Sequence, residues 1–359
     1  MSDRAEKIRE MRRRMGTLPH QAPKVSTRFF RGVEGIQVSL IDGPVNPYRS
    51  MFAMATSTWG AATADVARRW EETDPEDRFE VVRSVLLGQA LPLALEAPKF
   101  SFAISGLSRW SFDQIVRARL GVVYASLGTR DNCHADIPFR FHESTWKDPG
   151  KLRLAKEVAL HAKAAYGMFM DSGVSSWQEG RELLPISVAH RFVMAINFAA
   201  LRSMCASRMT FSEAEDTVAV AWLLRDRLMK PDAFPYLAAW LRPRCDYAGA
   251  CCYHRAHTMA EAFGCLYRSC GRNPVKSAPG MPPIDYELAD FNEACSDAET
   301  ISRQLGIRIP GPAEERPEGL TFADLSARDR LLLEEDGGAF ELGPSGTPSM
   351  GVGGEEIEP

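Results

Sequence analysis

The segment from residue 108 to residue 132 sets fixed positive charges among apolar side chains. It reads SRWSFDQIVRARLGVVYASLGTRDN and contains Arg109, Arg117, Arg119 and Arg130. The planar guanidinium group of arginine donates paired, charge-assisted hydrogen bonds and is suited to phosphate. A solvated helix face with salt bridges is the plainer interpretation, but the apolar neighbours leave little polar face for it. The segment is therefore a candidate anion-binding element.

A helix predicted over residues 110–127 would carry Arg117 and Arg119. Two residues along an α-helix correspond to a rotation of about 200°, so these side chains would point to different sides. Gln114 lies three residues before Arg117 and would share its face. Such a helix can serve two bound groups at once, or one ligand and a neighbouring subunit.

A second arginine-bearing segment lies further along the chain. Arg181 precedes a turn that ends in a proline, and a buried helix is predicted over residues 188–208. Asn197 and Arg208 are eleven residues apart, about three helical turns, so they would lie on one side of that helix. Two arginine-bearing segments in apolar surroundings predict an anionic, phosphorylated ligand.

Cysteine and histidine residues gather between residues 245 and 270. The cluster consists of Cys245, Cys251, Cys252, His254, His257, Cys265 and Cys270. Thiolates and imidazoles at short spacing can bind zinc, and Cys245, Cys251, Cys270 and His254 are the candidate ligands. The spacing lacks two CxxC pairs, so buried structural cysteines are the favoured interpretation and no metal is assigned. An iron–sulfur cluster or a redox pair is a further alternative.

The elements that must position these residues form a strand–helix series followed by a run of helices. Strands are predicted over 35–43 and 99–109 from alternating apolar residues. Helices are predicted over 48–60, 74–89, 110–127, 151–173, 175–185, 188–208 and 212–230. This order predicts an α+β fold with helices gathered on a small sheet. A doubly wound nucleotide-binding fold is disfavoured because the sequence has neither a P-loop nor a GxGxxG motif after a strand.

Composition excludes several classes of protein. The 359 residues carry a net charge of −4, with 45% hydrophobic and 25% charged residues, so nothing argues for a nucleic-acid or membrane protein. Eight cysteines in a chain of this length are not a secreted disulfide framework. The start of the chain is charged and has no apolar signal region, so a cytoplasmic protein is expected. Its basic residues 1–30 predict a solvated arm or an oligomer contact rather than a nucleic-acid site.

The arginine segments resemble the flavin-dependent thymidylate synthase family. That family carries an Arg-His-Arg signature on a helix after a strand, with a glutamine three residues before the first arginine and a serine and an arginine after the signature. Here Gln114, Arg117, Arg119, Ser126 and Arg130 occupy those places.

The resemblance extends to segments on both sides of this signature. Downstream, the family runs from an arginine through Leu-Pro to an asparagine and an arginine on a helix, as do Arg181, Asn197 and Arg208. Upstream, ATST at 55–58 is similar to the early flavin-contacting serine segment. GQALPLALEAPKFSF at 88–102 is similar to the Gly-His-x-Thr-Pro-Phe-Glu loop and the strand after it.

The resemblance covers about residues 35–230 and implies a fold, an activity and cofactors. Members are homotetramers with a small mixed or antiparallel sheet and a helical layer, and their active sites form between subunits. They bind FAD, take a one-carbon unit from methylenetetrahydrofolate to C5 of dUMP, and use NADPH to regenerate reduced flavin. The resemblance therefore implies that this chain methylates a pyrimidine deoxynucleotide monophosphate.

Roles carried over from the family fall into three groups. Flavin contacts are implied for Ser57, Glu96, Arg117, Arg119, Asn197 and Ser203. Nucleotide contacts are implied for Gln114, Arg117, Ser126, Arg130, Arg181 and Arg208. Arg117 and Arg208 are the catalytic candidates, because cations beside the pyrimidine carbonyls and phosphate stabilise charge as C5 becomes nucleophilic. The family requires no side-chain nucleophile, so none is assigned.

The sequence also departs from the family pattern. Ala118 and Gln89 stand where the family has histidines, and Ala125 replaces an acidic residue before Ser126. These departures leave two alternatives open, a C5-hydroxymethylase of dUMP or dCMP and a non-catalytic nucleotide-binding relative.

The predicted organisation has four parts. An arm spans 1–30, a catalytic domain 31–235, a Cys-rich helical extension 236–307, and a Pro-, Gly- and Glu-rich tail 308–359 with a weakly held end.

Overall fold

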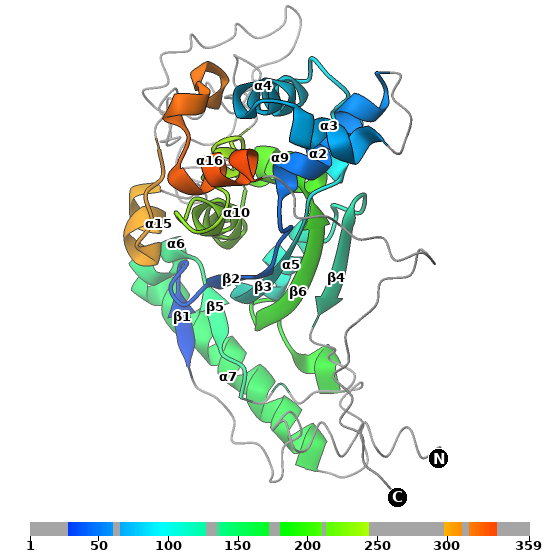
Figure 1. The fold of residues 1–359 in the computed structure, drawn as a ribbon. Helices are drawn as coiled ribbons and strands as arrows, with labels where there is room; N and C mark the ends of the chain where they lie inside the picture. Colours follow the sequence, from blue (N-terminus) through cyan, green and yellow to red (C-terminus); the bar gives the residue numbers. More distant parts are fainter. Residues whose placement is uncertain are drawn as a thin grey trace, which may run out of the picture.

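A computed structural model provides the fold (Figure 1). It describes residues 28–59, 65–126, 134, 136–171, 180–209, 213–243, 298–310 and 316–335. Within these residues the main sheet has four antiparallel strands in the order β2-β3-β6-β4. The strands are β2 (Gln37–Asp42), β3 (Lys99–Ser108), β6 (Ala189–Asn197) and β4 (Val122–Ser126). The predicted α+β fold with a small antiparallel sheet is confirmed.

Alternating side chains give the sheet one fully buried face. On β3, Phe100, Phe102 and Ile104 are buried, while the residues between them are half-buried. On β6, Met194 and Ile196 repeat the pattern and pair with β3 in register. The buried face packs against α10 (Glu215–Leu228), whose residues are almost all buried.

Helices cover this face and form the upper layer in Figure 1. They are α2 (Pro47–Ser57), α3 (Asp65–Glu72), α4 (Pro75–Leu86), the 3-10 helix η1 (Pro92–Glu96), α9 (Phe198–Arg208) and α11 (Pro235–Ala239). Asn46 caps α2 by accepting from the amide of Arg49. The helices predicted over 48–60, 74–89 and 212–230 are therefore present, with ends shifted by a few residues.

A second, smaller core lies under the long helix α7 (Pro149–Asp171), which the sequence predicts over 151–173. Strands β1 (Phe29–Arg31) and β5 (Phe139–Phe141) pair in parallel beside it, and the short helix α6 (Glu143–Lys147) leads into α7. Lys163 of α7 is fully buried and donates to the carbonyl oxygen of His134 at 2.9 Å.

The described residues after position 297, which are 298–310 and 316–335, join the main core. In α15 (Ala298–Leu305) Ile301 is buried, and in α16 (Ala327–Glu334) Leu332 and Leu333 are buried among the helices of the upper layer. The 3-10 turns η3 (Pro317–Gly319) and η4 (Phe322–Asp324) connect them along the surface. The segment boundaries at 235 and 307 stay predictions, and the predicted Cys-rich cluster and the end of the tail lie outside the described residues.

Two predicted helices are wrong over half of their length. The segment 110–127 forms α5 (Arg109–Ile115), then turns and becomes strand β4. The segment 188–208 forms β6 and only then α9. In both, a short alternating apolar run supports a strand as well as a helix, and pairing within the sheet decides between them. Of the helix predicted over 175–185, the described part holds the 3-10 turn η2 (Arg181–Leu183).

Within the described residues, no helix is long and apolar enough to cross a bilayer.

Candidate functional site

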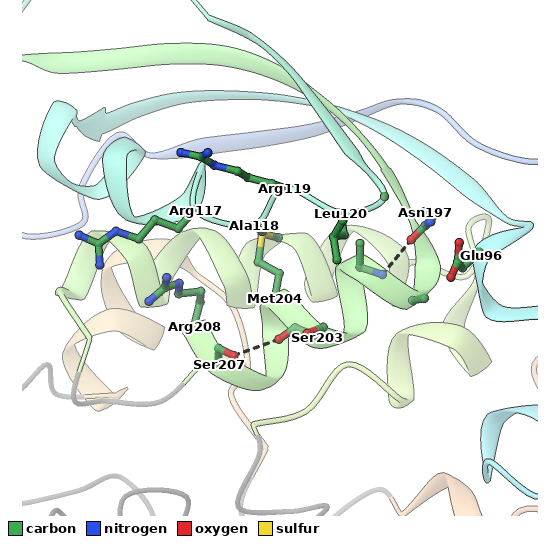
Figure 2. A pocket seen from close by; sticks show the side chains of 13 residues that line it. Glu96, Arg117, Ala118, Arg119, Leu120, Asn197, Ser203, Met204, Ser207 and Arg208 are labelled. Atoms are coloured by element: carbon green, nitrogen blue, oxygen red, sulfur yellow. Dashed lines mark hydrogen bonds between the residues drawn. The ribbon is translucent and has the colours of Figure 1, made fainter. Parts of the chain in front are cut away.

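A cavity of about 570 Å³ lies between α9 and the turn that follows α5 (Figure 2). Six of the residues predicted for the site line it: Glu96, Arg117, Arg119, Asn197, Ser203 and Arg208. They come from η1, the turn after α5, the end of β6, and α9, and these segments span residues 96 to 208 of the sequence. The fold thus brings together the two arginine-bearing segments that the sequence singled out.

Helix α9 supplies one wall of the cavity. Asn197 ends β6 and caps α9, and its side-chain oxygen accepts from the amide of Ala200 at 2.8 Å. Ser203 lies along the same wall, and Arg208 is the last residue of the helix, where a cation complements the helix dipole. Asn197 and Arg208 both line the cavity, but the prediction that one helix carries them is wrong, because Asn197 is the last residue of β6.

The opposite wall is the segment Val116–Gly121, which we call the arginine turn. Arg117 and Arg119 lie in this turn and not on a helix, so the predicted rotation of about 200° between them is wrong. Figure 2 shows both side chains extending from the turn on the same side of the view as Arg208. The local reason is that α5 ends at Ile115 and the β-branched residues after Gly121 pair with β6.

The end of the arginine turn requires a glycine. Gly121 has a φ of +69°, and a Cβ atom at this position would lie 2.5 Å from Nδ2 of Asn197. The carbonyl of Gly121 accepts from the amide of Asn197 at 2.9 Å. The turn therefore meets the start of α9 at a contact that no larger residue could occupy without displacement.

The start of the turn is held at the carbonyl end of α5. A helix leaves its last carbonyls without partners inside the helix. Arg208 donates from Nη2 to the carbonyl of Gln114 at 3.0 Å. The hydroxyl of Tyr124, on β4, lies 3.0 Å from the carbonyl of Ile115 and 3.1 Å from that of Ala118. Side chains of the neighbouring elements therefore satisfy these carbonyls.

The charges of the cavity favour an anion. Its lining has three arginines and one glutamate, Glu96, so its formal charge is +2. Arg208 forms an ion pair with Glu213 at 2.7 Å, and both side chains are mostly buried. Arg117 and Arg119 are exposed and have no ion-pair partner within the residues that the structure describes. Their donors are available to a ligand.

Several predicted site residues lie elsewhere in the single chain. Gln114 contributes its backbone carbonyl to Arg208, and Ser126 lies exposed at the end of β4. Arg181 is exposed in η2, and Ser57 is the exposed last residue of α2, where its hydroxyl donates to a backbone carbonyl. Arg130 falls outside the described residues. The cavity of one chain does not include these four described residues.

The apolar residues around the predicted arginine helix divide into two groups. Ile115 is buried, as expected for a core residue, but Leu120 is 88% exposed and Val123 is 69% exposed. Val193 of β6 is also exposed, on the face of the sheet opposite to α10. An apolar surface of this kind beside a binding cavity is typical of a contact with another chain.

Sequence reasoning missed three residues that shape the site: Gly121, Tyr124 and Glu213. A glycine followed by the β-branched pair Val122 and Val123 is a turn-to-strand signal that could have identified Gly121. Nothing in the sequence pattern indicates the contacts of Tyr124 or Glu213, because both are made across elements.

No group of three or more His, Cys, Asp or Glu residues that could hold a metal ion occurs in the described part of the chain. The candidate zinc ligands Cys245, Cys251, His254 and Cys270 lie outside it, so the metal assignment stays a prediction.

Comparison with known proteins identifies the family. Residues 39–232 match the sequence model described as "Thymidylate synthase complementing protein", and they make up more than half of the chain. The chain belongs to this family. The match spans β2 to α10 and so contains every residue that lines the cavity.

Curated relatives carry a flavin-dependent name. A flavin-dependent thymidylate synthase from Pyrococcus furiosus is 26% identical over 223 residues, which cover 60% of this chain and 89% of the relative. A flavin-dependent thymidylate synthase from Thermococcus onnurineus is 25% identical over 227 residues, which cover 61% of this chain and 89% of the relative. The resemblance to the flavin-dependent thymidylate synthase family is confirmed, and this chain is a divergent member.

The solved structures that this chain is similar to are more distant in sequence. The UMP/dUMP methylase PolB from Streptomyces cacaoi, bound with 5-Br dUMP, is 16% identical and gives a TM-score of 0.47, covering 56% of this chain and 92% of that one. ThyX from Helicobacter pylori, complexed with FAD and dUMP, is 15% identical and gives a TM-score of 0.41. The match covers 54% of this chain and 93% of ThyX.

Proposed function

We propose that this protein transfers a one-carbon unit to C5 of a pyrimidine deoxynucleotide monophosphate and converts dUMP to dTMP, with FAD and methylenetetrahydrofolate. One observation carries the proposal: the cavity with a formal charge of +2 lies inside the family region and gathers Arg117, Arg119 and Arg208 from separate elements. Both ligands that the relatives' names suggest, a flavin and a nucleotide, carry phosphate groups. The enzyme is expected to work in the cytoplasm, without a nucleic-acid or membrane partner.

The cavity suits a flavin dinucleotide. Glu96, Asn197 and Ser203 offer polar groups along one wall, and the free guanidinium groups of Arg117 and Arg119 match a pyrophosphate. Ser57 remains a proposed flavin contact outside this cavity. When bound, reduced flavin, regenerated by NADPH, would supply the reducing equivalents that complete a methyl group.

Arg208 and Arg117 are the proposed catalytic residues. Their guanidinium groups would lie beside the pyrimidine carbonyls and stabilise the negative charge that develops as C5 becomes nucleophilic. Arg208 is held by Glu213 and by the carbonyl of Gln114, so its cation is preorganised before any ligand binds.

A homotetramer would complete the nucleotide site. Gln114, Ser126, Arg130 and Arg181 are the other proposed nucleotide contacts, and those described lie apart from the cavity in one chain. Assembly would bring such residues from neighbouring subunits to the arginine turn. The exposed apolar side chains beside the cavity, Leu120 among them, support such a contact.

The decisive experiment weighs the product. Purified protein is incubated with FAD, dUMP or dCMP, and isotopically labelled methylenetetrahydrofolate, with and without NADPH. A labelled methyl product from dUMP that forms only with NADPH supports the proposal. A hydroxymethyl product that forms without NADPH would instead support the hydroxymethylase, which the relatives' names disfavour.

Two departures support the non-catalytic alternative: Ala118, which lines the cavity where the family has a histidine, and Ala125, which replaces an acidic residue before Ser126. Absorbance spectroscopy separates this alternative. A yellow protein that retains or takes up FAD supports the enzyme, whereas a colourless protein that binds no added FAD supports the non-catalytic relative.

A further inference from the structure

The arginine turn carries two cations that the proposed function uses, yet it has no regular secondary structure. The amide of Ala118 donates to the carbonyl of Ile115 at 3.2 Å, a weak closing bond for the turn. Each residue of a short segment that must be ordered when a ligand binds lowers affinity, because its backbone loses about 1–2 kcal/mol of conformational freedom. A group that holds the turn beforehand would therefore matter to binding.

Tyr124 is placed to hold it. Its hydroxyl lies 3.0 Å from the carbonyl oxygen of Ile115 and 3.1 Å from that of Ala118, so its single proton is shared between the two carbonyls and links the start and the middle of the turn. The carbonyl of Ala118 and the amide of Arg119 belong to the same planar peptide unit. A hydrogen bond to that carbonyl therefore fixes the direction in which the chain enters Arg119.

The support behind Tyr124 is rigid. Tyr124 pairs with Met194 of β6 in the main sheet, and its ring packs against Phe192 with 6.1 Å between ring centroids. Burial raises the pKa of the Tyr124 hydroxyl to about 12, so it keeps its proton and remains a donor under physiological conditions. Tyr124 is not part of the cavity lining and would act only through the turn.

We propose that Tyr124 is a positioning residue for the ligand-binding arginines, and that it preorganises the arginine turn by bridging the carbonyls of Ile115 and Ala118. The identity of the ligands rests on the proposed function. The ordering of the turn does not, because it follows from contacts within the ligand-free chain.

Tyr124→Phe removes the hydroxyl and keeps the ring. Tyr48→Phe is the matched control, because it removes another buried hydroxyl, which donates to Asp329 in the helical layer and not at the cavity. We expect Tyr124→Phe to weaken FAD and dUMP binding by about tenfold, which corresponds to ordering about one further residue on binding. Tyr48→Phe should lower the melting temperature and leave both affinities unchanged.

A double-mutant cycle tests whether Tyr124 acts through Arg119. In an Arg119→Ala background, Tyr124→Phe should cause little further loss of FAD affinity. Two results would show that Tyr124 has a structural role alone. One is that the losses of FAD affinity from the two substitutions simply add. The other is that Tyr124→Phe lowers only the melting temperature.

Amide hydrogen exchange in the ligand-free protein separates this proposal from the proposed function. Tyr124→Phe should accelerate exchange in residues 116–121 and leave the exchange of α10 unchanged, and Tyr48→Phe should not affect the turn. Unchanged exchange in the turn overturns the positioning role. If the wild-type protein binds neither FAD nor dUMP, the proposed function fails, and the exchange result still decides the role of Tyr124.

Discussion

At the scale of single residues, Arg208 illustrates how one side chain serves the fold and the site together. Its guanidinium group joins Glu213, which precedes α10, to the last turn of α5 through the carbonyl of Gln114. The same group lines the cavity. A ligand therefore meets a cation whose direction is set by two neighbours.

Glu213 is expected to affect nucleotide binding through Arg208. In Glu213→Ala the charged hydrogen bond is lost, and dUMP affinity should fall about fivefold or more because Arg208 must be ordered by the ligand. Glu213→Gln keeps an oxygen acceptor and should give an intermediate loss. Calorimetric titration with dUMP measures both, and tighter binding to either variant would mean that Glu213 competes with the nucleotide instead of orienting Arg208.

Gly121 offers a residue-scale test of the contact between the turn and α9. Gly121→Ala combines a positive φ with a Cβ atom 2.5 Å from Asn197, so it should lower the free energy of unfolding by about 3 kcal/mol or more. Gly88 has a similar φ of +74°, but a Cβ atom there would meet no atom within 4 Å. Gly88→Ala should therefore lower the free energy of unfolding by only about 1 kcal/mol. Urea unfolding measures both, and equal losses would contradict the close contact.

At the scale of elements, helix α7 is held against the segment before β5 by buried polar residues, because Lys163 donates to the carbonyls of His134 and Ile137. His134 and His190 are buried, and the fully buried Lys163 donates to the carbonyl of His134. Burial lowers the pKa of each histidine to about 4, and Arg109 and Arg191 lower both pKa values further by charge repulsion. Lys163 adds repulsion at His134 alone, where Asp136 opposes it. Both imidazoles are therefore neutral in the folded protein at pH 7.

This arrangement predicts a pH dependence. An unfolded histidine takes up its proton near pH 6.5, whereas the folded one does so near 4, so the histidines lower stability as the pH falls from about 6.5 to about 4. Burial raises the pKa of Glu215 and Asp329, which has the opposite effect on stability. The test therefore compares the free energy of unfolding of two proteins at pH 7 and at pH 5. Between these pH values, His190→Phe should lose less unfolding free energy than the wild type. Equal losses in the two proteins would contradict the prediction.

At the scale of the whole molecule, the fold extends past the family region. Asp329 of α16 is fully buried and accepts from the amide of Tyr236 at 3.0 Å and from Ser326 at 2.7 Å, and the hydroxyl of Tyr48 also donates to it. Arg78 of α4 is buried and donates to the carbonyl of Leu333. The described residues 316–335 are therefore part of the same core as α2 and α4.

Helix α16 provides a matched pair for this prediction. Leu333→Ala removes a fully buried side chain and should lower the free energy of unfolding by about 2–5 kcal/mol. The side chain of Leu331, on the same helix, is 51% exposed. Leu331→Ala should therefore change the free energy of unfolding by less than about 1 kcal/mol. Chemical unfolding followed by circular dichroism measures both, and similar small losses would show that α16 packs only loosely.

The sequence predicted the fold class and much of the cavity because those features depend on local patterns. The alternation of Phe100, Phe102 and Ile104 predicted β3, and two arginine-bearing segments predicted residues that now share one cavity. The same patterns failed for β4 and β6, where an apolar run of five to nine residues supports either a strand or a helix.

Features that depend on contacts between distant elements could not be predicted. The exposure of Val123 follows from the position of β4 beside β6 in the sheet, and that of Leu120 from its place in the arginine turn, and neither follows from the apolar character of these residues. The bonds from Tyr124 and Glu213 also require the folded arrangement, because each joins two elements that no spacing rule relates.

The direct passage from β6 into α9 has a practical consequence for protein engineering. β6 ends at Asn197 and α9 begins at Phe198, so no flexible loop separates the sheet from the cavity wall. Ala199 and Ala200 face the cavity from the well-anchored backbone of α9 and are small. A designer can therefore narrow the cavity one methyl group at a time and so adjust which base or cofactor analogue is accepted, without redesigning the scaffold.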